Sequence, residues 1–124
     1  MEHLKILLVE DDYVINVDMC GVLEELGLFV TSVHTAHDAV AEIDSHHCFE
    51  ALLTDIDLGV GLNGFDVARH GREHYPHLAV VFVSGTMAAR HAADGVARSV
   101  FVAKPFHPRD IRAALDRAVY LEAA

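Results

Sequence analysis

The stretch ALLTDIDLGVGLNG, residues 51–64, is where we expect the chain to carry out its chemistry. An apolar run that begins at Ala51 carries a carboxylate, Asp55, to its end and then gives way to a glycine-rich loop. A short apolar run bounded by turn residues is typical of a buried strand, and open α/β sheets bind ligands outside the carboxyl ends of their strands. An Asp at a strand end can equally be a turn or capping residue, so the other strand ends must decide between the two interpretations.

Five apolar runs of strand length alternate with helical patterns along the chain. Strands that alternate with helices at this spacing predict a parallel sheet with helices on both faces, joined by right-handed crossovers. We therefore expect an α/β fold with a doubly wound, five-stranded parallel sheet of (βα)5 type. The expected strands are residues 4–9, 28–32, 49–54, 78–83 and 99–102, and the expected helices are residues 14–26, 36–43, 65–73, 87–93 and a last one that begins at Pro108.

Length and composition limit the classes of protein that the chain can belong to. The 124 residues suffice for one domain, and we expect a single domain over residues 1–124 with no effector domain. A formal net charge of −10 argues against direct nucleic-acid binding, because phosphate neutralisation needs basic residues. No apolar run is long enough for a membrane span, and the first residues lack an export signal, so we expect a cytoplasmic protein. Cys20 and Cys48 lack C-x-x-C spacing and are interpreted as reduced.

Chemically active side chains follow four of the five predicted strands. Glu10 and Asp11 follow the first, Asp55 the third, Ser84 the fourth and Lys104 the fifth. A parallel sheet gathers these strand ends on one edge. Crowded carboxylates repel one another unless a cation joins them, and Mg²⁺ prefers such oxygen ligands. A divalent ion, a carboxylate nucleophile and a fixed ammonium are the parts that phosphoryl transfer needs.

In four motifs the sequence resembles the receiver domain of two-component response regulators, and the resemblance covers essentially the whole chain. The motifs are Ile6-Leu-Leu-Val-Glu-Asp-Asp12, Asp55 with Asn63-Gly64, Val81-Phe-Val-Ser-Gly85 and Phe101-Val-Ala-Lys-Pro-Phe106. The resemblance implies the flavodoxin-like three-layer sandwich. It also implies a phosphorylated aspartate, which would be Asp55, and a Mg²⁺ cofactor held by Glu10, Asp11, Asp55 and the backbone carbonyl of Asp57.

The same resemblance assigns roles at the fourth and fifth strand ends. Ser84 would be the hydroxyl switch that turns toward the phosphoryl group, Lys104 would pair with that group, and Phe101 would be the aromatic rotamer switch. The bond before Pro105 is commonly cis in this family. The implied partners are a histidine kinase or histidine phosphotransfer protein, which donates the phosphoryl group, and a downstream protein target.

The chain departs from the family pattern in two segments. The loop from Asp55 to Gly64 is one residue longer than the commonest form, with Gly59 and Gly61 where a proline usually lies. The segment from Ser84 to Lys104 is about two residues short. That segment includes the fourth helix, part of the family's output surface, so a homodimer through the usual face is not assured.

Two other functions compete with a phosphoacceptor. The Asp55-Ile-Asp57 pattern also resembles the nucleophile and general acid of haloacid-dehalogenase-type phosphatases, but those enzymes need a larger core and an acidic pair after the nucleophile. A docking module that works without phosphorylation is the other alternative, because a fold alone does not determine function.

His70 and His74 stand one helical turn apart, the spacing of a two-histidine metal site. No third ligand is apparent in the sequence. We therefore interpret both as partly solvated helix histidines.

Overall fold

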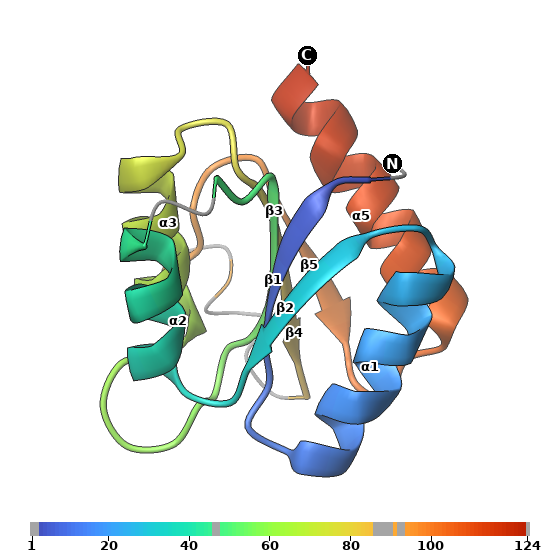
Figure 1. Ribbon diagram of the computed structural model, residues 1–124, viewed down its shortest axis with the longest axis horizontal. Coiled ribbons are helices and arrows are strands. Elements are labelled where there is room, and N and C mark those ends of the chain that lie inside the picture. The colour runs from blue at the N-terminus through green and yellow to red at the C-terminus, as the bar shows by residue number, and fades with distance from the viewer. Residues whose placement is uncertain (1–2, 46–47, 86–90, 92–93, 124) are drawn as a thin grey trace.

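The structure is a computed structural model that describes residues 3–45, 48–85, 91 and 94–123 (Figure 1). The expected helix over residues 87–93 falls almost entirely outside these residues. In the described part, strands and helices alternate from the first strand to the fourth, and the last helix follows the fifth strand. The elements are β1 (Lys5–Val9), α1 (Tyr13–Glu25), β2 (Phe29–Val33), α2 (Ala36–Asp44), β3 (Ala51–Asp55), α3 (Gly64–His74), β4 (Ala79–Ser84), β5 (Ser99–Ala103) and α5 (Pro108–Ala123).

All five strands lie in one parallel sheet, in the order β2-β1-β3-β4-β5. The predicted α/β fold with a five-stranded parallel sheet is thus confirmed, and the strand bounds agree with the prediction to within one or two residues. The chain reverses its direction of travel across the sheet between β1 and β3, because β2 lies outside β1 and β4 lies outside β3. Ligands of such folds bind at this switch point.

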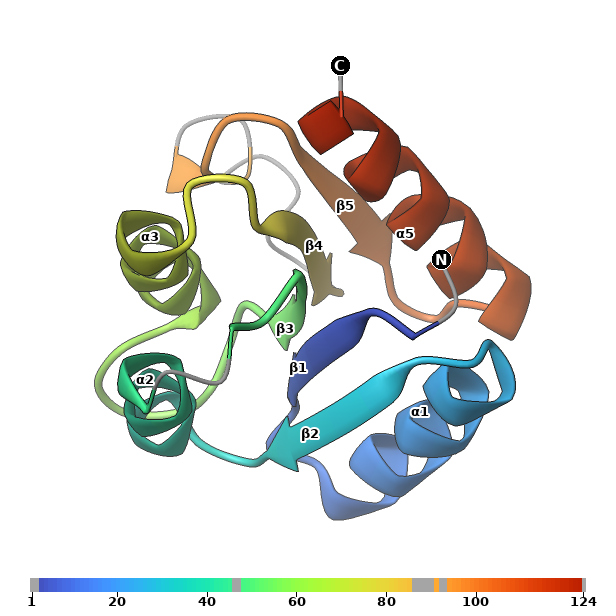
Figure 2. The same ribbon diagram turned by 45° about the horizontal axis from the view of Figure 1, so that its top comes forward.

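Helices cover both faces of the sheet, as Figure 2 shows: α1 and α5 lie on one face, and α2 and α3 lie on the other. Successive residues of a strand point to opposite faces, so β1 serves both layers. Ile6 and Leu8 pack in the layer with Leu23 of α1, whereas Leu7 and Val9 pack in the layer with α2 and α3. All four of these β1 side chains are at most 1% exposed, which explains the nearly continuous apolar sequence of the strand.

Capping residues mark the ends of the first two helices. Asp12 caps α1, where its carboxylate accepts hydrogen bonds from the backbone N–H groups of Val14 and Ile15. Thr35 caps α2, where its hydroxyl accepts from the N–H of Asp38. Gly27 follows the last turn of α1 with a positive φ of 86°, which a residue with a side chain adopts only with strain.

The sequence pattern of α1 was partly misleading. Val14 is apolar but 71% exposed, whereas the polar Asn16 is 2% exposed. Asn16 is buried because its amide makes hydrogen bonds to backbone carbonyls that an apolar residue could not make. No helix in the described part of the chain is long and apolar enough to cross a membrane.

Candidate functional site

The predicted site residues lie at the carboxyl edge of the sheet, around the switch point. Glu10 and Asp11 follow β1, and Asp55 is the last residue of the neighbouring strand β3. One carboxylate oxygen from each of these three residues lies within 4.8 Å of the others. The structure therefore brings Asp55 together with an acidic pair that lies more than 40 residues before it in sequence.

Lys104 joins this cluster from the loop after β5. Its Nζ lies 2.8 Å from Oδ2 of Asp55 and 3.2 Å from Oε1 of Glu10. Burial acts to lower the pKa of Lys104, but the hydrogen bond and charge of Asp55, together with the charge of Glu10, outweigh it and raise the pKa. The ammonium is therefore firmly charged and holds the two carboxylates together.

Glu10 is the most buried acid of the cluster, with 1% of its surface exposed. Burial raises its pKa, and the nearby charge of Asp55 raises it further. The backbone N–H of Asp12, which donates to Oε2 at 3.0 Å, acts in the opposite direction.

The donor set fits a hard divalent cation. If each carboxyl group is counted as −1 and the ammonium as +1, the formal charge is −2, and carboxylate oxygens within a few ångströms of one another are the ligands that Mg²⁺ prefers. Glu10, Asp11 and Asp55 are the side chains that could hold such an ion. The other ends of the Glu10 and Asp55 carboxylates are held by Asp12 N–H and Asp57 N–H, at 3.0 and 3.3 Å.

Gly64 determines how the helix after Asp55 packs against the site. A Cβ on Gly64 would overlap the backbone carbonyl oxygen of Asp55 and lie 2.8 Å from Cα of Ile56. The N–H of Gly64 donates to the Ile56 carbonyl at 2.8 Å, and Asn63 and Asp66 form a capping box. The Asn63-Gly64 pair thus anchors α3 directly against the strand end that carries Asp55.

Asn16 of α1 supports the site through hydrogen bonds to the backbone, and the sequence analysis missed it. Its side-chain amide donates to the backbone carbonyls of Glu10 and Val33, both at 3.1 Å. It therefore ties α1 to the turn that carries Glu10 and to the end of β2. A polar residue one turn into an otherwise apolar helix face was the only available signal in the sequence.

The remaining predicted site residues surround the cluster, and the backbone N–H of Asp57 contacts it directly through Oδ1 of Asp55. Ser84 ends β4 and is 3% exposed, and its carbonyl accepts from the N–H of Lys104 at 3.0 Å. Asp57 is exposed, and its side chain accepts from the N–H of Gly59 at 3.3 Å. Phe101 of β5 is half-buried beside the His91 ring, with ring centroids 5.7 Å apart. The Lys104–Pro105 bond is cis, as the family resemblance implied.

Comparison with known proteins agrees with this arrangement. The family model for the response regulator receiver domain matches residues 6–116. The response regulator receiver protein CpdR of Brucella abortus is 31% identical over 109 residues, which cover 86% of this chain and 89% of that protein.

Solved structures show the same fold over nearly the whole of this chain. A response regulator receiver protein from Sinorhizobium medicae matches with a TM-score of 0.93 and 29% identity, over 98% of both chains. The receiver domain of the sensor histidine kinase PA1611 from Pseudomonas aeruginosa matches with a TM-score of 0.80 and 25% identity, over 95% of this chain and 98% of that one. That structure has a magnesium ion coordinated in its active site cleft. The chain described here belongs to the response regulator receiver domain family.

Proposed function

We propose that this protein is a phosphoacceptor response regulator of a two-component or phosphorelay system, in which Asp55 accepts the phosphoryl group. The observation that carries the proposal is the 2.8 Å contact between Lys104 Nζ and Oδ2 of Asp55, in an otherwise acidic site. A carboxylate 8% exposed at the sheet edge is reachable by a donor and still positioned by its neighbours. This combination favours group transfer over a purely structural ion pair.

The proposed step uses one oxygen of Asp55 as the nucleophile. That oxygen forms a bond to phosphorus while the bond between phosphorus and the donor histidine nitrogen breaks, and the imidazole leaves with the electron pair of that bond. Lys104, already within hydrogen-bond distance of Asp55, neutralises charge on the phosphoryl oxygens. The product is an acyl phosphate on Asp55. Water later attacks its phosphorus, the bond between phosphorus and the Asp55 oxygen breaks, and inorganic phosphate leaves, which restores the carboxylate.

Glu10, Asp11 and Asp55, with the backbone carbonyl of Asp57, would hold the Mg²⁺ ion. When bound, this ion neutralises charge on the acidic cluster and on the incoming phosphoryl oxygens. Glu10, anchored by the Asp12 N–H and by Lys104, keeps the acidic cluster in place.

Signal output would follow from rearrangement around the modified Asp55. Ser84 ends the strand next to β3 and would turn its hydroxyl toward the phosphoryl group, and Phe101 would change rotamer on the adjoining strand β5. The net charge of −10 favours output through protein contacts over direct contact with nucleic acid. The proposal includes one receiver domain over residues 1–124 and a location in the cytoplasm. A histidine kinase or histidine phosphotransfer protein would act upstream, and a protein target would act downstream.

Intact mass spectrometry tests the phosphoacceptor directly. The chain is incubated with acetyl phosphate, with and without Mg²⁺, beside Asp55→Asn and the matched control Asp116→Asn, which changes an exposed acid of α5. We expect a gain of one phosphoryl group that requires Mg²⁺, occurs in the control and is lost in Asp55→Asn. Peptide mapping of the adduct then locates it on Asp55.

The other outcomes identify the competing functions. Steady release of phosphate without a lasting adduct would favour the phosphatase. Absence of both an adduct and detectable Mg²⁺ binding would favour a docking module that works without phosphorylation. Small-angle scattering with and without a beryllofluoride adduct tests whether activation produces a homodimer.

A further inference from the structure

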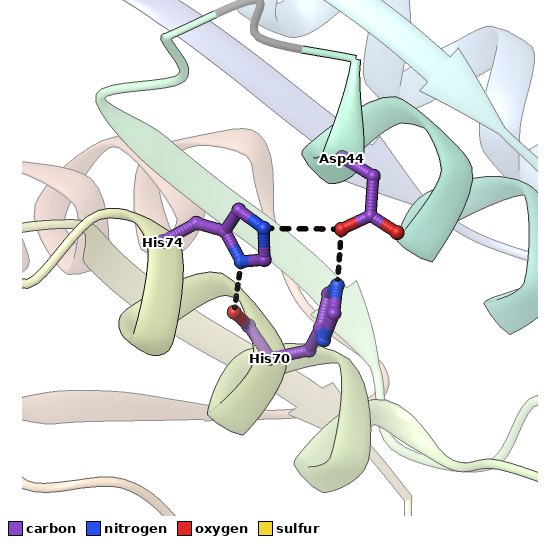
Figure 3. A group of neighbouring side chains, drawn as sticks. All are labelled: Asp44, His70 and His74. Carbon is purple, nitrogen blue, oxygen red and sulfur yellow. Dashed lines mark hydrogen bonds and ion pairs between the residues drawn. The ribbon is translucent and has the colours of Figure 1, made fainter.

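A second cluster of metal-ligating side chains lies where α2 and α3 end, outside the acidic site. His70 and His74 project from successive turns of α3, and Asp44 is the last residue of α2 (Figure 3). One ligand atom from each of these three residues lies within 4.8 Å of the others. Asp44 lies 26 residues before His70 in sequence and supplies the third ligand that the sequence analysis did not find.

The two imidazoles converge on one oxygen. Nε2 of His70 lies 2.7 Å and Nε2 of His74 lies 3.1 Å from the same Oδ1 of Asp44. Ligand atoms of a tetrahedral zinc site are about 3.3 Å apart, as follows from zinc–nitrogen and zinc–oxygen bonds of about 2.0–2.1 Å. The cluster therefore needs only small movements to place all three atoms around one ion, with an open position for water.

The hydrogen bonding of His74 directs its Nε2 lone pair into the cluster. Nδ1 of His74 lies 3.3 Å from the backbone carbonyl of His70, and a carbonyl can only accept, so Nδ1 carries the hydrogen. In a neutral ring, Nε2 then has a lone pair that faces a carboxylate oxygen. Two acceptors in contact repel unless a cation lies between them, and a backbone carbonyl that orients the ring in this way is the usual support of a metal-bound histidine.

The surrounding backbone also favours a cation at this position. Both α2 and α3 end here, and the carbonyl end of a helix carries partial negative charge. The two helix ends are held together, because the Tyr75 hydroxyl donates to the Ile43 carbonyl at 2.9 Å. A carboxylate at a helix C-terminus is unfavourable by itself, and a bound cation removes that penalty.

From this geometry we propose that Asp44, His70 and His74 form a binding site for a borderline divalent transition metal, with Zn²⁺ as the expected ion. Two imidazole nitrogens and one carboxylate oxygen are a ligand set that zinc uses and that Mg²⁺ does not prefer. The ion would join α2 to α3. This site is independent of the proposed phosphoacceptor site. The phosphoacceptor site uses oxygen ligands at the carboxyl ends of the strands, whereas the histidine cluster lies at the carboxyl ends of α2 and α3.

Isothermal titration of the full chain with ZnCl2, in excess MgCl2 to occupy the oxygen site, provides the test. We expect one zinc per chain. Binding should weaken about tenfold or more in each of His70→Gln, His74→Gln and Asp44→Asn, and should be unchanged in the control His37→Gln, which removes an exposed histidine of α2. Thermal unfolding of the parent chain should shift upward by several degrees in excess zinc, and this shift should be absent in His70→Gln.

Nitrogen NMR of the imidazole rings distinguishes zinc bound to the Nε2 atoms from a proton bound there. Zinc on Nε2 of His70 and His74, with Nδ1 of His74 still protonated, would support the site. If the ring nitrogen signals of His70 and His74 do not change when zinc is added and respond only to pH, the proposal is overturned. Zinc binding that survives His70→Gln and His74→Gln, or that is lost in Asp55→Asn or Cys48→Ser instead, would also overturn it.

Discussion

Lys104 Nζ lies 2.8 Å from Oδ2 of Asp55 and, at 3.2 Å, also contacts Oε1 of Glu10. One ammonium from the loop after β5 therefore joins carboxylates from the ends of β3 and β1, three strands that do not follow one another in sequence. The site is held together by charge as well as by the sheet. A substitution of Lys104 therefore removes a hydrogen bond and a neighbouring positive charge from both Asp55 and Glu10.

Lys104→Ala leaves Glu10 and Asp55 buried without their shared cation. We expect the free energy of unfolding at neutral pH, without divalent ions, to fall by about 2 kcal/mol. Mg²⁺ should then stabilise the variant more than the parent chain, because the formal charge of the site changes from −2 to −3 with the loss of one ammonium. Urea unfolding with and without Mg²⁺ measures both effects. Lys5→Ala, at an exposed position, is the control, and an equal response to Mg²⁺ in variant and parent would contradict the prediction.

Gly64→Ala should disturb the site through the backbone. The added Cβ meets the carbonyl oxygen of Asp55 and Cα of Ile56, neither of which can move aside by changing a rotamer. We expect a loss of about 2 kcal/mol in unfolding free energy, with slower phosphoryl uptake at Asp55. Gly21→Ala is the matched control, because it lies in α1 with nothing within 4 Å of the new Cβ, and it should stabilise the chain by about 0.5–1 kcal/mol. Similar stabilities for the two variants would show that α3 tolerates displacement.

Asn16→Ala removes the two hydrogen bonds that tie α1 to the Glu10 turn and to β2. The carbonyls of Glu10 and Val33 would lose a buried donor, so we expect the unfolding free energy to fall by about 2 kcal/mol. Val17→Ala, one residue along and 61% exposed, should change it by less than about 0.5 kcal/mol. Chemical denaturation of both variants measures the difference, and equal stabilities would mean that water replaces the amide at no cost.

The pH dependence of stability should include a contribution from His91. Its ring lies against Phe82 and Phe101, its Nε2 lies 2.9 Å from the Ser99 hydroxyl, and burial lowers its pKa below the ordinary 6.5. In this range the unfolded chain takes up the proton first, so stability is retained above pH 6.5 and falls as pH drops toward the lowered pKa of the folded state.

His91→Gln removes this titration, and the fall in unfolding free energy between about pH 8 and about pH 5.5 should therefore be smaller than in the parent chain. His77→Gln, whose side chain is 88% exposed, serves as the comparison. Urea unfolding across this range provides the measurement. A pH dependence in His91→Gln identical to that of the parent would contradict the assignment.

Much of the fold was predictable because its signals are local. The apolar runs of β1, β3 and β4 are buried on both faces, so each reads as a strand without knowledge of its neighbours. The cap residues Asp12 and Thr35 act within three residues of themselves. Asn16 was not predictable in this way, because its partner Val33 lies 17 residues away, at the end of β2.

The sequence by itself therefore determined the parallel sheet and the residues that stand at its carboxyl edge, because parallel strands align their ends whatever their order. Only the tertiary structure decided which of those residues touch. It placed Lys104 between Asp55 and Glu10, and it brought Asp44 to the histidine pair of α3. Both outcomes depend on the strand order and on how two helices pack side by side, and these arise from contacts between segments that no short stretch of sequence contains.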